Sequence, residues 1–112
     1  MATALPLNTF RTRPFELTTS TQTIYTTPNS YTCIVLGAQA SNIGNQPVTI
    51  TFVLSKNDID YVLLKEFEIP INDAVDIISG KLVIEQNAYV KAFASANNSV
   101  NLVLSILETN NE

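Results

Sequence analysis

The chain has 112 residues, of which 46% are hydrophobic and only 14% are charged, with a net charge of −4 and no histidine. This length suits one domain with one core. An acidic chain without a basic field argues against a nucleic-acid partner and against an anionic membrane surface. Because charges are scarce, either Thr, Asn, Ser and Gln side chains keep the protein surface hydrated, or part of that surface is buried against other subunits.

The cysteine count and the first residues bear on the compartment. Cys33 is the only cysteine, so no intrachain disulfide can form and nothing marks an oxidising compartment. The sequence MATALPLNTF has neither a basic start nor a long apolar run, so we expect no signal peptide. No run reaches the length of a transmembrane helix.

Residues 1–14 are predicted to form an extended N-terminal arm. Pro6 and Pro14 disfavour a helix and a central strand. Leu5, Leu7 and Phe10 are apolar, yet the segment is too short to bury them itself, and a disordered tail is expected to be poorer in Leu and Phe. We therefore expect the arm to lie across a neighbouring subunit.

Arg11 and Arg13 are the only arginines of the chain. We expect them either to pair with acidic groups on a partner or to remain solvated. Together with the apolar residues of the arm they form the predicted partner-binding set: Leu5, Leu7, Phe10, Arg11 and Arg13.

The rest of the chain alternates apolar and polar residues in short segments rich in β-branched side chains, which is typical of strands. In residues 48–55, for example, Val48, Ile50, Phe52 and Leu54 are predicted to face inward. The predicted strands are 15–19, 22–26, 31–42, 48–55, 60–69, 81–85, 89–96 and 100–107.

Two connections carry specific expectations. Asn97, Asn98 and Ser99 have hairpin chemistry, because Asn tolerates positive φ, so strands 89–96 and 100–107 are predicted to form a long hairpin. Residues 72–79 are the only candidate helical turn, with Asn72 or Asp73 as its cap.

About eight strands with almost no helix predict an all-β fold, an antiparallel β-sandwich that is jelly-roll-like or immunoglobulin-like. The chain has no Trp and no Cys…Trp…Cys pattern, which disfavours a true immunoglobulin domain. The predicted organisation is an arm at 1–14, a sandwich at 15–108 and a polar tail at 109–112.

The residue types exclude the commonest catalytic and metal sites. Without histidine, neither a Ser-His-Asp nor a Cys-His site can be built, and one cysteine cannot make a Cys/His zinc site. The three glycines are isolated, so no phosphate-binding loop exists. We therefore predict a protein that is not an enzyme, with no catalytic, cofactor-binding or metal-binding residues.

Several weaker signals have ordinary structural interpretations. Asn57, Asp58 and Asp60 are too few oxygen ligands for a Ca²⁺ loop and are predicted to be turn residues. Cys33 is predicted to be a small core residue. An alternative of another kind is a carbohydrate-binding module, with an aromatic platform built from Tyr25, Tyr31, Tyr61 and Tyr89.

Several segments, taken in order over residues 8–108, resemble small virion structural proteins of tailed phages, with those of cyanobacterial and marine phages most similar. They are TIYTTPNSYTCIVLGAQASNI, FEIPINDAVDIISGKLVIE and VKAFASANNSVNLVLSILE. Members of that family often have a Gly-Asp turn after the glutamate, where this chain has Gln86 and Asn87. The resemblance implies a β-sandwich module that assembles on heads or tails and has no catalytic site.

From the arm, the few charges and this resemblance we expect a virion protein made in the host cytoplasm. We expect it to bind itself, as a trimer, and to bind major capsid or tail proteins. Capsid decoration or cementing is the leading role, because an extended arm could clamp neighbouring capsid subunits. The alternative is a tail, baseplate or fibre-attachment component. Neither nucleic acid nor membrane is an expected partner.

Overall fold

The structure is a computed structural model that describes residues 8–111, and within this range it has nine β-strands and no helix. The all-β prediction is therefore confirmed. The strands are β1 (Asn8–Glu16), β2 (Gln22–Thr26), β3 (Tyr31–Asn42), β4 (Val48–Lys56), β5 (Ile59–Ile69), β6 (Ala74–Asp76), β7 (Leu82–Ile84), β8 (Tyr89–Ala94) and β9 (Val100–Asn110).

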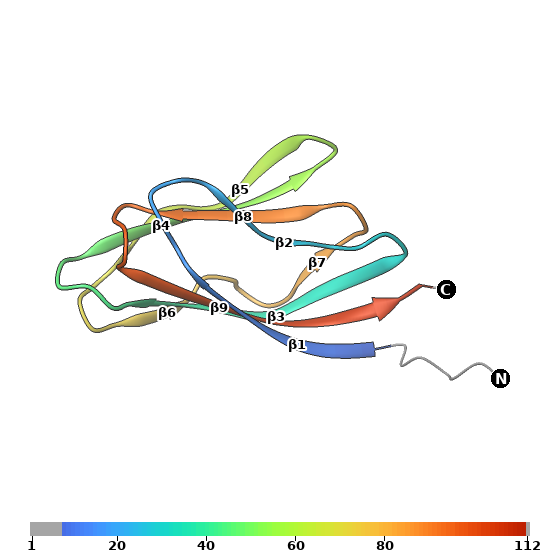
Figure 1. Cartoon of the computed structure of the whole chain (residues 1–112), viewed down its shortest axis with the longest axis horizontal. Helices are drawn as coiled ribbons and strands as arrows, with labels where there is room; N and C mark the ends of the chain where they lie inside the picture. Colours follow the sequence, from blue (N-terminus) through green and yellow to red (C-terminus); the bar gives the residue numbers. More distant parts are fainter. Residues whose placement is uncertain (1–7, 112) are drawn as a thin grey trace.

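The strands form two antiparallel sheets that pack face to face (Figure 1). Sheet A has the order β1-β9-β3-β6, and β7 also pairs with β3. Sheet B has the order β2-β8-β4-β5. Each sheet covers the apolar face of the other, as in a β-sandwich.

The topology is that of a jelly roll. The antiparallel pairings are nested along the chain, because β1 pairs with β9, β2 with β8, β3 with β6 and β7, and β4 with β5. The pairings of β9 with β3 and of β8 with β4 then complete the two sheets. Of the two predicted architectures, the jelly roll is the correct one.

The core lies between the sheets and is built from alternate residues of the long strands. Val48, Ile50 and Phe52 of β4 are buried as predicted, and Leu54 is partly buried against them. They face a row of buried side chains from β9: Val100, Leu102, Leu104 and Ile106. Cys33 is fully buried in the same core, which confirms its predicted role.

The predicted hairpin between residues 89–96 and 100–107 is wrong. Asn98 has the positive φ of 57° expected of a turn, but β8 lies in sheet B and β9 lies in sheet A. The chain therefore crosses between the sheets here. The crossing is held by two neighbouring loops, because Thr19 N donates to Asn97 Oδ1 and Ile43 N donates to Ser99 O.

The predicted helical turn at 72–79 is also wrong. Asn72 has a φ of 63°, and the residues after it form β6, which pairs with Gln39–Ser41 at the edge of β3. A strand as long as β3 leaves backbone groups along that edge without partners, and pairing satisfies them. Tertiary pairing has here overridden the local helical signal.

Two predicted boundaries of the sandwich need correction. Asn8 to Pro14 belong to β1, which pairs with β9 along its whole length, so this part of the predicted arm lies in sheet A. Pro14 fits there because β1 is an edge strand. At the other end, β9 continues to Asn110, beyond the predicted start of the tail. Leu5 and Leu7 lie outside the described residues.

Candidate assembly surface

The outer face of sheet A carries an apolar row that runs across four strands. Residues directly opposite each other in a sheet share a face, and the register aligns Phe10 of β1 with Leu107 of β9, Leu107 with Ile34 of β3, and Ile34 with Val83 of β7. Phe10 is 73% exposed and Val83 is 55% exposed, while the two central residues are half-buried. These four residues are called the apolar row below.

A bulge in β3 widens the apolar row. The register of β3 against β9 shifts between Val35 and Gly37, and this shift leaves Leu36 exposed. Leu36 lines a shallow hollow together with Phe10, Thr12 and Ser105. The hollow is therefore a place where an apolar side chain of another molecule would contact the apolar row.

The rest of this face carries few charges. The outward residues of β3 and β9 are Thr32, Ile34, Leu36, Gln39 and Ser41, and Asn101, Val103, Ser105, Leu107 and Thr109. None of them is charged. At the end of the face near both described chain ends, side-chain hydrogen bonds join Thr109 to Asn8 and Thr32 to Asn111. The outer surface of sheet A is therefore uncharged along its two central strands, and we call it the sheet A face.

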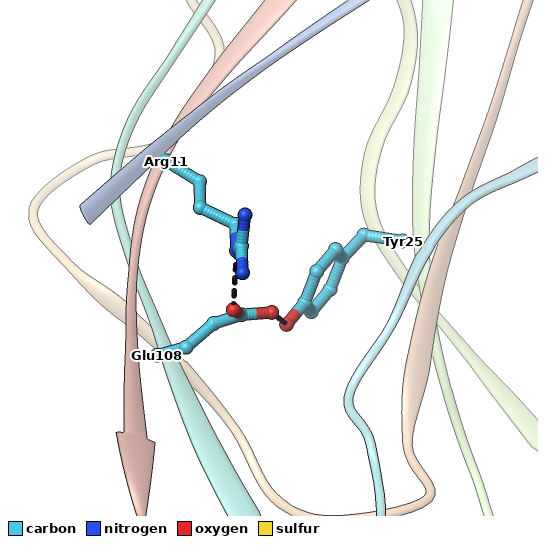
Figure 2. A network of polar contacts seen from close by, with 3 residues as sticks. All are labelled: Arg11, Tyr25 and Glu108. Atoms are coloured by element: carbon cyan, nitrogen blue, oxygen red, sulfur yellow. Dashed lines mark hydrogen bonds and ion pairs between the residues drawn. The ribbon is translucent and has the colours of Figure 1, made fainter. Parts of the chain in front are cut away.

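The inner side of β1 is organised by a buried carboxylate. Glu108 of β9 is 8% exposed and accepts hydrogen bonds from two strands (Figure 2). The Nε of Arg11 donates to its Oε1 at 2.6 Å, and the hydroxyl of Tyr25 in β2 donates to its Oε2. Burial raises the pKa of Glu108, but the hydrogen bonds from Tyr25 and Arg11 outweigh burial and leave the pKa below its ordinary value.

The two predicted partner-binding arginines both lie on this inner side. Arg13 places its guanidinium 6.0 Å from the centroid of the Tyr25 ring, next to the contact of Arg11 with Glu108. In this structure the acidic group that Arg11 meets is Glu108 of its own chain. Phe10, by contrast, lies on the outer side, in the apolar row.

Glu108 itself was missed by the sequence-based reasoning, although a signal was present. It continues the inward alternation of Leu102, Leu104 and Ile106, so the period of two places an acid on the buried face. A buried carboxylate needs donors. The only two arginines of the chain were the obvious candidates.

A second exposed apolar surface lies along β5, the edge strand of sheet B. Five of its side chains are 43–56% exposed: Ile59, Tyr61, Val62, Leu63 and Phe67. Two shifts in its register against β4 interrupt the simple alternation predicted for 60–69, and Glu66 has a φ of 47°. Only Ile69, at its end, is fully buried. We call this surface the β5 edge.

The four tyrosines do not share one surface. Tyr25 is buried and bound to Glu108, and Tyr31 begins β3 in sheet A. Tyr61 and Tyr89 pair with Leu54 and Ser55, which are successive residues of β4 and so point to opposite faces of sheet B. The carbohydrate platform proposed from the sequence is therefore not assembled.

Two of the candidate calcium residues, Asn57 and Asp58, are turn residues, as predicted, whereas Asp60 lies in β5. Asn57 and Asp58 have φ values of 55° and 63° at the tip of the hairpin between β4 and β5, as a type I′ turn requires. Asp60 pairs with Lys91 at 2.8 Å. Within residues 8–111 no three His, Cys, Asp or Glu side chains gather as a metal site would need, and no helix there could span a membrane.

Neither the family models nor the curated proteins searched contain a sequence match to this chain. Solved structures do share its fold. A structure of Bacillus endospore appendages, which form a family of disulfide-linked pili, matches with a TM-score of 0.58 at 11% identity. That match covers 100% of this chain and 99% of the other.

A structure of the acid-stable capsid of the Helicobacter pylori bacteriophage KHP30 matches with a TM-score of 0.56 at 13% identity, over 96% of this chain and 90% of that one. A pentameric capsid protein from metagenomic phage sequences matches with a TM-score of 0.44 at 13% identity, over 88% of this chain and 60% of that one. The last likeness is too distant to carry an argument. The first two show that the described part of this chain has the same fold as those two structures.

Proposed function

We propose that this chain is a non-enzymatic structural protein of a tailed-phage virion, which binds copies of itself and the particle lattice and decorates or cements the capsid. The observation that carries the proposal is the sheet A face. A row of four apolar residues, two of them more than half exposed, crosses it without a charge on either central strand. Such surfaces mark interaction sites on soluble proteins.

The comparison with the KHP30 capsid supports the capsid role. That likeness extends over nearly the full length of both chains, so it concerns the domain as a whole. A subunit that adds to a lattice needs a complementary flat surface more than it needs a cavity or chemistry. The sheet A face meets this need.

A disulfide-linked fibre, suggested by the Bacillus appendage structure, receives less support. Its chemistry needs thiols that can reach another subunit. Cys33 is fully buried in this chain, and burial raises the pKa of its thiol to about 11, so the reactive thiolate is disfavoured.

The test is the copy number of the chain in purified virions of the phage that encodes it, measured by quantitative mass spectrometry. A capsid decoration protein is expected on the order of hundreds of copies, in proportion to the major capsid protein. A few to about a few dozen copies would instead assign the chain to the tail, baseplate or fibre attachment. Absence from the particle would contradict the virion role.

A further inference from the structure

Strand β1 is attached to the domain in an unusual way. Within residues 8–111 it pairs only with β9, and all nine of its residues are exposed or half-buried. None of them belongs to the buried core, and Phe15 is its only apolar side chain that packs against that core. The strand therefore contributes little apolar burial, the main source of stability in most strands.

What holds β1 is a specific set of polar contacts. Nine residue pairs align it with β9, from Asn8 opposite Thr109 to Glu16 opposite Asn101. On its inner side, Arg11 binds Glu108 and Arg13 lies over Tyr25. A one-residue slip would turn both arginines to the outer face. These contacts thus fix the register of the strand without burying it.

The chain is anchored again immediately after β1. Leu17 N donates to Val100 O, Ala94 N donates to Thr18 O, and Leu17 is fully buried. A strand of nine residues spans about 30 Å. If β1 pivoted at Leu17, it would reach well beyond its own domain while the remaining eight strands stayed in place.

We propose that β1 is exchanged between copies of this chain, so that the β1 of one copy pairs with the β9 of the next. The acceptor site is the one already seen within the chain, with Glu108 and Tyr25 receiving the partner's arginines. Exchange keeps the contacts that β1 makes with its acceptor, and its main cost is the freedom of motion that two chains lose when they associate. Domain swapping is for this reason a low-cost route to assembly.

The exchange would also complete the apolar row from two chains. Phe10 would then come from one copy, while Leu107, Ile34 and Val83 would come from the other. Association through the sheet A face and exchange of β1 would favour each other. This inference rests on the structure of β1 and does not need the virion role to hold.

The test uses two single-cysteine additions at one register pair. Thr12 of β1 lies opposite Ser105 of β9, and both are exposed. Opposite residues have Cα atoms about 4.5–5.5 Å apart, within reach of a disulfide. Full-length Thr12→Cys and Ser105→Cys chains with different tags are co-expressed, purified together at high concentration and oxidised. Cys33 stays in place because it is buried.

The expected product is a disulfide between residues 12 and 105 of two different chains, identified by mass spectrometry. The matched control pairs Thr12→Cys with Asn101→Cys, because Asn101 is exposed on the same strand but lies opposite Glu16. We expect the 12–105 product to exceed this control by at least about tenfold, because a disulfide needs Cα atoms within about 7 Å. Equal yields, no interchain product, or chains that stay monomeric would overturn the exchange.

Discussion

The hydroxyl of Tyr25 donates a hydrogen bond to the carboxylate of Glu108, and this contact joins β2 of sheet B to β9 of sheet A (Figure 2). It is a polar contact between the two sheets, across an interior that is mostly apolar. The same carboxylate holds Arg11, so one buried acid links three strands. The attachment of β1 to the sandwich therefore depends on Glu108.

Glu108→Gln is expected to destabilise the domain by about 1–3 kcal/mol at neutral pH, because it removes the negative charge that accepts the hydrogen bonds of Arg11 and Tyr25. The measurement is urea unfolding followed by circular dichroism. The matched control is Glu85→Gln, whose side chain is 62% exposed and pairs with Lys56. An exposed pair contributes about 0–1 kcal/mol. Equal losses of unfolding free energy in the two variants would show that the buried contact contributes no more than an exposed ion pair.

The contribution of Glu108 is expected to vanish in acid. Its pKa in the folded state is below its ordinary value of 4.5. A lowered pKa gives stability that is present above the unfolded pKa and is lost as the pH falls through the folded pKa. The difference in unfolding free energy between wild type and Glu108→Gln should therefore be constant above about pH 5 and shrink below it. A difference that persists at the lowest pH would assign the effect to packing.

Asn42 is expected to be a second polar residue on which stability depends. It is 5% exposed, and its Nδ2 donates to the carbonyls of Gln46 and Ile69 at 2.8 and 3.0 Å. Its Oδ1 accepts from Gly44 N at 2.9 Å. Asn42→Ala leaves these groups without partners and should cost about 1–3 kcal/mol in thermal or urea unfolding.

The comparison variant for Asn42 is Asn101→Ala, at an exposed position of β9. A surface change of this kind is expected to stay within about 0.5 kcal/mol. If Asn42→Ala behaves like Asn101→Ala, the loop after β3 is not organised by this side chain.

Cys33 is expected to resist thiol reagents in the folded protein. It is fully buried, and burial raises the pKa of its thiol to about 11. Colour development with a disulfide reagent should therefore be absent from the native protein at neutral pH and reach one thiol per chain in urea. Rapid labelling of the native protein would contradict the burial of Cys33 in the core.

The sequence predicted those parts of the fold that depend on local pattern. Alternation located β3 and β4 almost residue by residue, because the long buried strands repeat with a period of two. It also identified Cys33 and Phe52 as core. These features need no knowledge of what lies beside each strand.

What the sequence could not predict depends on partners that are distant along the chain. The turn at Asn98 has the same local chemistry whether the next strand pairs with β8 or crosses to the other sheet. Within residues 72–79, Ala74–Asp76 form β6 because β3 offers an open edge. The apolar row appears only once the register places Phe10, Leu107 and Ile34 side by side.

The central claim, that the sheet A face binds the particle, is tested most directly by incorporation in competition. Phe10→Asp puts a charge in the apolar row at a side chain that is 73% exposed, while Val62→Asp does the same on the β5 edge at 56% exposure. Each variant is supplied with an equal amount of wild-type chain during phage growth, and quantitative mass spectrometry gives their ratio in purified virions. We expect Phe10→Asp to be depleted and Val62→Asp to be incorporated like wild type. Equal incorporation of Phe10→Asp would contradict the account.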